Sequence, residues 1–482
     1  MKHVTIFVIL ICVSSALSCA QSYDKRVDSN LNAIPIENSS VDIADACVIK
    51  ENIKWSTLYD HPLHPYMDSA ITIEIQDSII NQIHKRLISA SDSLMTSDIF
   101  YIWKPYFEWL NHQDPHYVII PIIPYNIDYS SANRNIELKK AIKKFNKSAK
   151  ILPISLLQIN DTLIVEQSLC KELEKGDIII NINGITTKQL LDYNYRNRHY
   201  DAYIMLTYYF YNGFANEYSV EVKRGDDLIV VQVPGYSGIN DYEFRKRQLR
   251  QTEHNIREYP EYNTGYVAIP EFYPNNSRLF KILRRTILSF KNKGYNSVIL
   301  DMRNNPGGYG HGFNMLLSLF IDAPSVPYMR CQRFKAEDKV VEIKSGESII
   351  NSIPLNNEYY IDGIKYYVLM DEGTGSVAAS FCNILQYNGA AILVGEPLKH
   401  NALKFGETQP GRRFYSLTSS TSLFNVWLQE GAVSTVEYDE YTKNPNGYLL
   451  PDIALDYSVD EYASGDDGML NQLLDILSVN YE

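Results

Sequence analysis

The clearest change in hydrophobic pattern along the chain lies between residues 366 and 389. Residues 366–370 form a short apolar run rich in β-forming side chains, which predicts a buried strand. The apolar residues beyond it recur at the spacing of one helix face, at Val377, Phe381, Ile384 and Leu385. Residues 371–375 form the turn between these elements. Ser376 therefore stands where a strand has ended and a helix begins.

A serine at this position has two interpretations. A helix N-terminus offers unpaired N–H groups and the positive end of a dipole, which stabilise the oxyanion formed when a hydroxyl attacks a carbonyl. Gly373 and Gly375 remove side chains that would block a sharp approach to Ser376. However, serine is also a favoured helix N-cap, and an ordinary strand-to-helix connection has the same order. The pattern alone leaves the nucleophile and the cap open.

Apolar runs and helical periods alternate over most of the rest of the chain. We expect a helical region over residues 73–110, which ends before Pro115, and a strand over residues 117–123. A β-module follows, interrupted by the aromatic residues 203–218 and closed by a strand over residues 227–233. Beyond it the pattern predicts a charged linker helix, a strand, a helix and a buried strand that runs into Asn-Asn-Pro-Gly-Gly, at residues 245–262, 266–270, 279–293 and 296–301.

Length and charge set broad limits on the protein. A chain of 482 residues exceeds one ordinary core and predicts two or three domains. The hydrophobic fraction of 45% and the 37 tyrosines indicate globular structure rather than disorder. A formal net charge of -12 argues against nucleic acid as a partner.

The first residues indicate a secretory signal. Lys2 precedes an apolar run over residues 4–13 that is too short for a comfortable membrane span. Residues 16–19, Ala-Leu-Ser-Cys, resemble the lipobox of bacterial lipoproteins, in which an acylated Cys19 would attach the chain to a membrane. Cleavage after Ala20 would instead release a soluble protein. We favour the lipoprotein, and with it a location in the bacterial cell envelope.

Cysteine spacing argues against a metal centre. Outside the signal, the cysteines are widely spaced and form no CxxC pair, at Cys47, Cys170, Cys331 and Cys382. We therefore expect no metal site, and no disulfide is needed in a chain of this size. Cys382 follows Ser376 on the predicted helix and is expected to be a core residue.

Residues 173–184 have the sequence LEKGDIIINING and resemble the L-x-x-G-D-x-I-x-x-I-N-G phrase of PDZ domains. Gly176 and Asp177 would make the turn into an alternating strand, and Asn183 and Gly184 the turn out of it. The resemblance implies that an extended chain end binds by strand addition at an open sheet edge. A β-module used only for packing is the alternative.

Four phrases in the second half of the chain fall in one order. They are Gly265-Tyr266, ILDMRNNPGG at residues 299–308, GTGS at residues 373–376 and GEP at residues 395–397. Together with LLPD at residues 449–452, they resemble the tail-specific, or C-terminal processing, serine peptidases. The phrase DLRNNPGG is specific, and this chain differs from it only at Met302. The resemblance implies an α/β peptidase core and peptide cleavage without a metal or organic cofactor.

The resemblance also assigns roles to residues. Ser376 matches the family's nucleophile, and either Gly307 or Gly308 matches its oxyanion-hole glycine. The N–H of Val377 would be the second oxyanion donor. Residues 376–379, Ser-Val-Ala-Ala, stand where the family commonly has SASE, so the glutamate of that phrase is missing.

The general base is where the chain departs most from the family. The Ser/Lys branch uses a lysine whose position is held here by Asn401, with Lys399 and Lys404 as alternatives nearby. The tricorn-type Ser/His branch takes its base from a D-x-H-T phrase, which Asp-Pro-His-Tyr at residues 114–117 matches at its Asp and His. We therefore favour the Ser/His branch with His116 as the base.

The acid that orients His116 stays open among three carboxylates, Asp114, Glu430 and Glu437. The predicted organisation is a multi-domain α/β protein with a signal peptide, a tether, an N-terminal helical region, a PDZ-like domain and a tail-specific peptidase core, at residues 1–19, 20–45, 46–130, 145–236 and 260–482.

The predicted function is a serine endopeptidase that cleaves peptides or unfolded proteins outside the cytoplasm by acyl-enzyme chemistry. The alternative is a catalytically inactive, peptidase-like protein that binds peptides without cutting them. The missing lysine and the missing SASE glutamate keep this alternative open.

Overall fold

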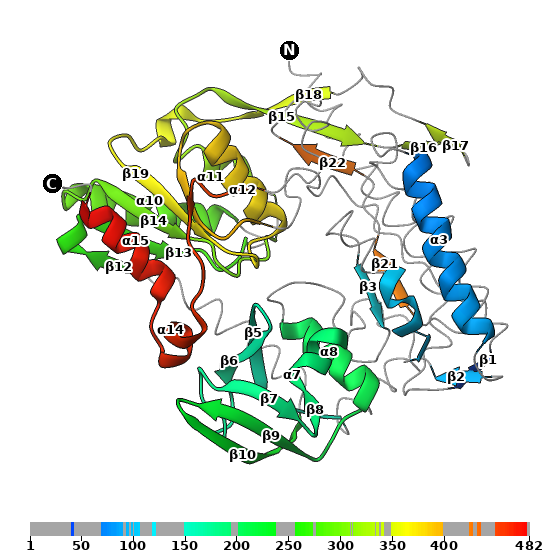
Figure 1. The fold of residues 1–482 in the computed structure, drawn as a ribbon. Coiled ribbons are helices and arrows are strands. Elements are labelled where there is room, and N and C mark those ends of the chain that lie inside the picture. Colours follow the sequence, from blue (N-terminus) through cyan, green and yellow to red (C-terminus); the bar gives the residue numbers. More distant parts are fainter. Residues whose placement is uncertain are drawn as a thin grey trace.

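The fold is mixed α/β, with several separate sheets (Figure 1). It is known from a computed structural model. The residues described are 40–42, 69–89, 93–95, 98–99, 101–106, 118–121, 149–193, 201–237, 256–272, 276–308, 310, 312–332, 334–336, 339–341, 349–398, 424–427, 431–434 and 449–479.

A six-stranded sheet, here called the core sheet, organises the C-terminal half. Its strands, in spatial order, are β12 (Ile256–Tyr259), β13 (Thr264–Ala268), β14 (Ser297–Asp301), β19 (Lys365–Met370), β20 (Ile392–Gly395) and β23 (Ile453–Ala454). Only β12 runs antiparallel to its neighbour, and the other pairings are parallel. Because β14 and β19 are parallel neighbours, the turns after them meet at the same edge of the sheet.

Helices cover both faces of the core sheet (Figure 1). One face packs against α10 (Asn276–Asn292), α11 (Phe313–Leu317) and α12 (Ser376–Tyr387), and the other packs against α15 (Gly468–Val479). Alternate residues of one strand therefore enter different clusters: Leu300 joins the α10–α12 side and Ile299 the α15 side. A sheet buried on both faces explains why its strands are nearly continuous apolar runs.

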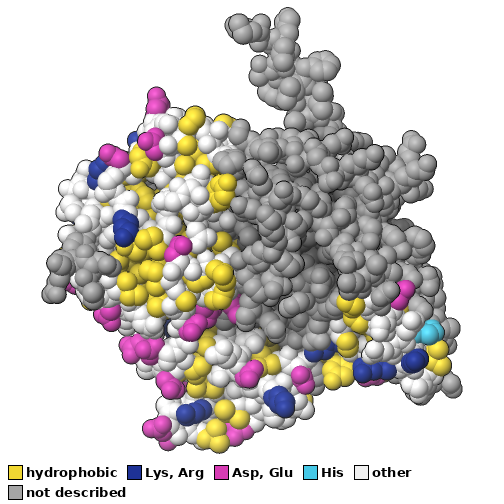
Figure 2. Space-filling model, turned by 45° about the horizontal axis from the view of Figure 1, so that its top comes forward, with side chains coloured by type: hydrophobic (Ala, Val, Ile, Leu, Met, Phe, Trp, Pro, Cys, Tyr) yellow, Lys and Arg dark blue, Asp and Glu magenta, His cyan; other side chains and the backbone are white. Residues whose placement is uncertain are grey.

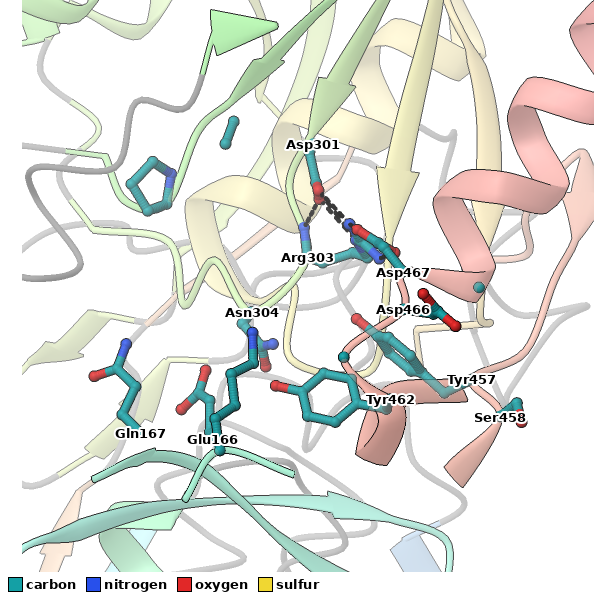
Figure 3. Close-up of a pocket in the computed structure, with 15 residues that line it drawn as sticks. Glu166, Gln167, Asp301, Arg303, Asn304, Tyr457, Ser458, Tyr462, Asp466 and Asp467 are labelled. Carbon is teal, nitrogen blue, oxygen red and sulfur yellow. Dashed lines mark hydrogen bonds and ion pairs between the residues drawn. The ribbon is translucent and has the colours of Figure 1, made fainter. Parts of the chain in front are cut away.

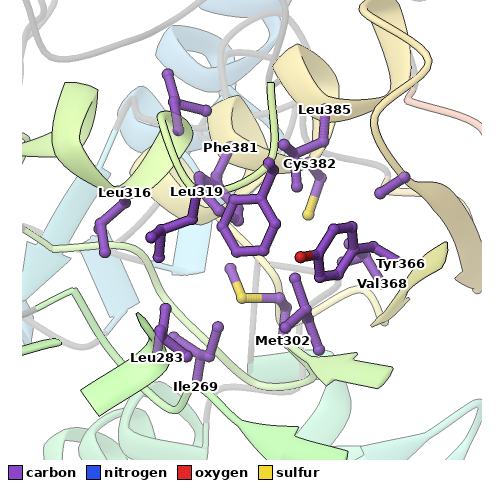
Figure 4. Packing of buried hydrophobic residues seen from close by; sticks show 14 of the residues in the cluster. Ile269, Leu283, Met302, Leu316, Leu319, Tyr366, Val368, Phe381, Cys382 and Leu385 are labelled. Carbon is purple, nitrogen blue, oxygen red and sulfur yellow. The ribbon is translucent and has the colours of Figure 1, made fainter. Parts of the chain in front are cut away.

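Figure 4 shows the larger of these clusters, with Met302, Tyr366, Phe381 and Cys382 packed between the sheet and its helices. Cys382 is fully buried, as the sequence predicted. Burial raises the pKa of its thiol to about 12.

A second six-stranded sheet, here called the β-module, lies between residues 149 and 237. Its main path is β10 (Asp227–Pro234), β9 (Glu217–Arg224), β7 (Ile178–Ile182), β6 (Thr162–Ser168) and β5 (Ile154–Ile159), and β8 (Ile185–Thr186) pairs with β7. Helices α7 (Thr187–Tyr193) and α8 (Asp201–Asn212) complete it. Gly176 and Asp177 precede β7, in agreement with the predicted turn. The resemblance of this module to PDZ domains stays a prediction.

The β-module rests on the C-terminal segment of the core. Leu157, Ile159 and Ile164 form an apolar cluster against which Tyr457 and Tyr462 pack. A Cβ atom on Gly176 would lie 2.4 Å from the carbonyl oxygen of Ala463, so only glycine permits this approach. Ala463 belongs to α14 (Val459–Ser464), which therefore forms part of the contact.

Shorter elements complete the described fold. They are β1 (Ser40–Asp42), α3 (Ser69–Ile88), β2 (Ser93–Met95), β3 (Val118–Pro121), β4 (Lys150–Ile151), β11 (Tyr236–Ser237), η4 (Pro260–Tyr262), β15 (Ser325–Gln332), β16 (Phe334–Ala336), β17 (Lys339–Val341), β18 (Ile349–Pro354), η5 (Asn357–Tyr359), β21 (Phe424–Trp427) and β22 (Gly431–Ser434). Among the described helices, none combines the length and apolar character needed to cross a bilayer.

Three predicted elements differ from the structure. The linker helix expected up to residue 262 is wrong over β12, because Ile256–Tyr259 pairs with β13 as an edge strand. The helical pattern over residues 73–110 contains α3, but β2 interrupts it by pairing with β1. The aromatic residues 203–218, where the pattern predicts no element, include most of α8.

Charged side chains are scattered over the described part of the surface in Figure 2, with Lys and Arg interspersed among Asp, Glu and hydrophobic residues.

Candidate active site

Ser376 is the first residue of α12 and follows the turn after β19, residues 371–375, here called the serine turn. Its φ angle is 50°, in the left-handed region that non-glycine residues rarely occupy. The N-cap of α12 is Gly375, so the interpretation of Ser376 as a conventional N-cap is wrong. A half-buried serine in a strained conformation at a helix N-terminus is the kind of backbone outlier that clusters at functional sites.

The turn after β14, residues 302–308 and here called the glycine turn, lies directly against Ser376. A Cβ atom on Gly307 would lie 2.7 Å from the Cβ atom of Ser376 and 2.8 Å from the backbone nitrogen of Val377. Gly307 has a φ of 97°, which also favours glycine. The structure thus brings Gly307, Ser376 and Val377 together, although about seventy positions separate the two turns in sequence.

Asn305 fixes the glycine turn in place. Its side-chain Oδ1 accepts a hydrogen bond from the Gly307 N–H at 2.9 Å, and its Nδ2 donates to the Ile269 carbonyl at 2.7 Å. Its own carbonyl accepts the Gly375 N–H at 2.9 Å. A fully buried asparagine therefore ties β13, the glycine turn and the serine turn to one another. Asn305 stands inside the ILDMRNNPGG motif, but the sequence alone does not indicate this role.

The hydrogen bonds distinguish Gly307 from Gly308 as candidate oxyanion-hole residues. The Gly307 N–H already has a partner in Asn305. Within the described residues, no hydrogen bond is made by the N–H of Gly308 or of Val377. The backbone of Gly308 packs directly against the backbone of Phe272. A Cβ atom on Gly308 would lie 2.0 Å from the Phe272 carbonyl oxygen, so the position requires glycine.

A cavity of about 250 Å³ opens beside this region, between the core and the β-module (Figure 3). Asn304 lines it from the turn after β14, Glu166 and Gln167 from the β-module, and Tyr457 and Tyr462 from the C-terminal segment. Ser376 does not line this cavity. Asn304 connects the cavity with the region around Ser376, because it belongs to the same turn as Gly307.

One wall of the cavity is an ion-pair network centred on Arg303, drawn with dashed lines in Figure 3. The Arg303 guanidinium, only 10% exposed, donates to Asp301 Oδ2 at 2.6 Å and to both carboxylate oxygens of Asp467 at 2.6 and 2.7 Å. Tyr266 donates to Asp301 at 2.7 Å. Burial opposes ionisation of Asp467, but the hydrogen bonds from Arg303 lower the pKa of that carboxyl overall.

Several predicted site residues lie outside the described residues. These are the two lysines, the histidine, the asparagine at the family's lysine position, the three candidate orienting acids and the cysteine of the lipobox: Lys399, Lys404, His116, Asn401, Asp114, Glu430, Glu437 and Cys19. In the part of the chain that the structure describes, no group of three His, Cys, Asp or Glu side chains could hold a metal ion.

The sequence of the core matches a known family. Residues 263–413 match the model of peptidase family S41. This segment belongs to peptidase family S41. It includes β13, β14, β19 and α12, and therefore Gly307 and Ser376.

Relatives of the S41 core carry related names. This chain is similar to a carboxyl-terminal-processing protease of Synechocystis sp., with 28% identity over 137 residues, which is 28% of each chain. Carboxyl-terminal-processing peptidase 3, chloroplastic, of Arabidopsis thaliana is 26% identical over 132 residues, which is 27% of this chain and 22% of the relative. Each match thus spans only about a quarter of the relative's length.

Solved structures show the same fold over most of the chain. The structure of mature CPAF complexed with lactacystin has a TM-score of 0.58 and 13% identity, and the match covers 91% of this chain and 98% of that one. The crystal structure of mature CPAF gives a TM-score of 0.56 at 12% identity, over 90% and 97% of the two chains. At 12–13% identity, the similarity shows only that the two solved structures and this chain share a fold, over the S41 core and the elements around it.

Proposed function

We propose that the protein is a serine endopeptidase of the tail-specific type, which cleaves peptide bonds through an acyl-enzyme. The observation that carries this proposal is the contact of Gly307 with Ser376 and Val377, because the Val377 N–H beside Ser376 makes no hydrogen bond within the described residues. The S41 match over residues 263–413 supports the same reaction class.

In the proposed mechanism, Ser376 Oγ attacks the carbonyl carbon of the scissile peptide bond. The hydroxyl proton passes to a general base and then to the leaving amine, and water hydrolyses the ester that remains on Ser376. The left-handed backbone conformation of Ser376 supports this role, because strained conformations of this kind cluster at active sites.

Gly308 and Val377 are the proposed oxyanion donors. Their N–H groups make no hydrogen bond within the described residues, whereas the Gly307 N–H is bound to Asn305. Gly307 would then serve by its missing side chain, which lets the turn approach Ser376. Backbone donors held in place before the reaction stabilise the developing charge without reorganisation.

His116 is the proposed general base. A neutral imidazole suits a serine nucleophile near neutral pH. The position in the Ser/Lys branch that holds lysine is Asn401 here, and an amide cannot accept the proton. Lys399 and Lys404 are the alternative bases, and the experiment below includes them.

The β-module is proposed to present a flexible substrate chain in the manner of a PDZ domain. Its contact with α14 and its share of the cavity wall beside Asn304 support a position next to the reaction centre. The substrates would be peptides or unfolded proteins outside the cytoplasm. The signal-like residues 1–19 support that location, with Cys19 as the proposed lipid attachment point.

The test is labelling of the full chain with a serine-directed fluorophosphonate, together with turnover of an unstructured protein. We expect wild type to be labelled and to cleave, and Ser376→Ala to do neither. His116→Ala should lose turnover, whereas Lys399→Ala and Lys404→Ala should keep it. Labelling that survives Ser376→Ala would refute the nucleophile, and loss with only a lysine variant would move the base to that lysine.

The inactive binding protein predicts a different result. It would bind the unstructured protein but leave it intact, and wild type would resist the fluorophosphonate. Asn401→Lys supplies a further comparison, because it restores the residue of the Ser/Lys branch. Activity gained only in Asn401→Lys would favour the binding protein over the peptidase.

A further inference from the structure

Asp371 is a fully buried carboxylate to which the proposed reaction assigns no part. It follows β19 and begins the turn that leads to Ser376. Its Oδ1 accepts a hydrogen bond from the Asn304 N–H at 2.8 Å and another from the Gly373 N–H at 3.0 Å. One oxygen atom therefore receives an N–H from the glycine turn and an N–H from the serine turn.

Thr374 strengthens the same junction. Its hydroxyl donates to the Met302 carbonyl at 2.9 Å and accepts the Asp371 N–H at 3.1 Å. Met302 and Asn304 lie in the turn after β14, so this second link also crosses between the two turns. The side chains of Asp371 and Thr374 are both fully buried, and hydrogen bonds to the buried Asp371 carboxylate are stronger than those in water.

The second oxygen of Asp371 has its own partner. Tyr457, from the C-terminal segment before α14, donates to Asp371 Oδ2 at 3.1 Å. The Tyr457 ring is held in turn by the apolar contact with the β-module and by the Arg303 guanidinium, which lies 5.9 Å from the ring centre. The carboxylate is thus fixed from both of its oxygens.

We propose that Asp371 is a positioning residue that sets the separation between Ser376 and the oxyanion donors by joining the serine turn to the glycine turn. Tyr457 holds the carboxylate in the orientation that reaches both turns. This inference rests on the proposed function, because it concerns the geometry of that reaction.

Asp371 suits this task better than an uncharged side chain. A carboxylate oxygen can accept two N–H groups at once, and its charge shortens and strengthens both bonds. Removal of the side chain would leave the half-buried Asn304 N–H and the buried Gly373 N–H without this acceptor, and the two turns would be free to separate. A displacement of about 1 Å at a reacting group can cost about 100-fold in rate.

The test measures the fluorophosphonate labelling rate, kcat and KM of the full chain, each corrected for the folded fraction from circular dichroism. We expect Asp371→Ala to lower the labelling rate and kcat by about 100-fold with KM little changed. Asp371→Asn should lose about 10-fold, because its amide oxygen can still accept the two N–H groups but its NH₂ cannot accept from Tyr457. Tyr457→Phe should lose less than Asp371→Asn.

Asp177→Ala is the matched control. Asp177 is also a buried carboxylate, and it accepts the Glu174 N–H at 2.8 Å and the Arg224 side chain at 2.7 Å, but it lies in the β-module. We expect this variant to lose stability while its folded fraction is labelled at the wild-type rate.

Equal labelling per folded molecule in Asp371→Asn, Tyr457→Phe and wild type would overturn the positioning role, and it would do so even if Asp371→Ala failed to fold. A rise in KM with unchanged kcat would also overturn it. Failure of the proposed function looks different, since Ser376→Ala would then be labelled like wild type.

Discussion

Gly307 and Ser376 lie so close together that a single added methyl group would collide. A Cβ atom on Gly307 would be 2.7 Å from the Ser376 Cβ and 2.8 Å from the Gly375 carbonyl oxygen. Two turns from neighbouring parallel strands are therefore packed backbone against backbone, and this contact sets Gly307 against the start of α12 at Ser376.

Gly307→Ala should disable the site. The new methyl group would push the glycine turn away from Ser376, and we expect kcat to fall by about 100-fold. The left-handed φ of 97° adds a stability cost of about 1 to 2 kcal/mol. Peptide turnover and urea unfolding measure the two effects.

Gly363→Ala is the control for this prediction. Gly363 also has a positive φ, of 69°, but nothing lies within 4 Å of its added Cβ. It should therefore lose similar stability and keep its activity. Equal loss of activity in both variants would contradict the contact as the cause.

Ser376→Gly should make the protein more stable while abolishing labelling. The φ of 50° is strained for serine and acceptable for glycine, so relief of the strain is worth about 1 kcal/mol. Ser376→Ala keeps a Cβ atom and should show no such gain. Thermal unfolding of the three proteins would decide, and a Ser376→Gly variant less stable than Ser376→Ala would count against stored strain.

Asp467 should make stability depend on acid pH. Its pKa in the folded protein is lowered by Arg303, so the unfolded chain binds its proton more readily. Its stabilising contribution is complete above the unfolded pKa of about 4 and is lost as pH falls through the lower folded pKa. Asp467→Asn should therefore flatten the dependence of the unfolding free energy on pH below about 4. Urea unfolding at several pH values tests this, and unchanged slopes would contradict it.

Cys382 should resist alkylation in the native protein. Burial raises the pKa of its thiol to about 12, so little of the reactive thiolate forms at pH 8, and the side chain is out of reach of the reagent. Iodoacetamide followed by peptide mass spectrometry should find Cys382 modified only after urea is added. The half-buried Cys170 should react sooner. Rapid native modification of Cys382 would show that the core around α12 opens.

Periodicity predicted the elements of the core well, for a physical reason. Leu279, Leu283 and Ile287 repeat at helical spacing because one face of α10 packs on the sheet. The same method failed at Ile256–Tyr259, whose residues are mostly exposed and polar. These residues form a strand because β13 offers an edge to pair with, and that partner is not visible in the local sequence.

The residues of the candidate site also fall into those that local sequence predicts and those that only tertiary contacts reveal. Ser376 and the glycine pair were predictable, because the strand, turn and helix pattern and the GTGS and NNPGG phrases are local. The choice between the Gly307 and Gly308 amides was not, since it depends on where the Asn305 side chain points. Asp371 and Tyr457 carried no signal at all, as 86 positions separate them in sequence.

The sequence by itself determined most strands and helices of the core sheet and its cover, and which hydroxyl begins α12. Tertiary structure alone decided which turns touch, because the parallel register of β14 against β19 sets the glycine turn beside the serine turn. It also decided which backbone donors of the described turns make no hydrogen bond within the described residues, and which carboxylate joins the turns. Hydrogen bonds between distant residues form only when packing has fixed the distances, and no local pattern records those distances.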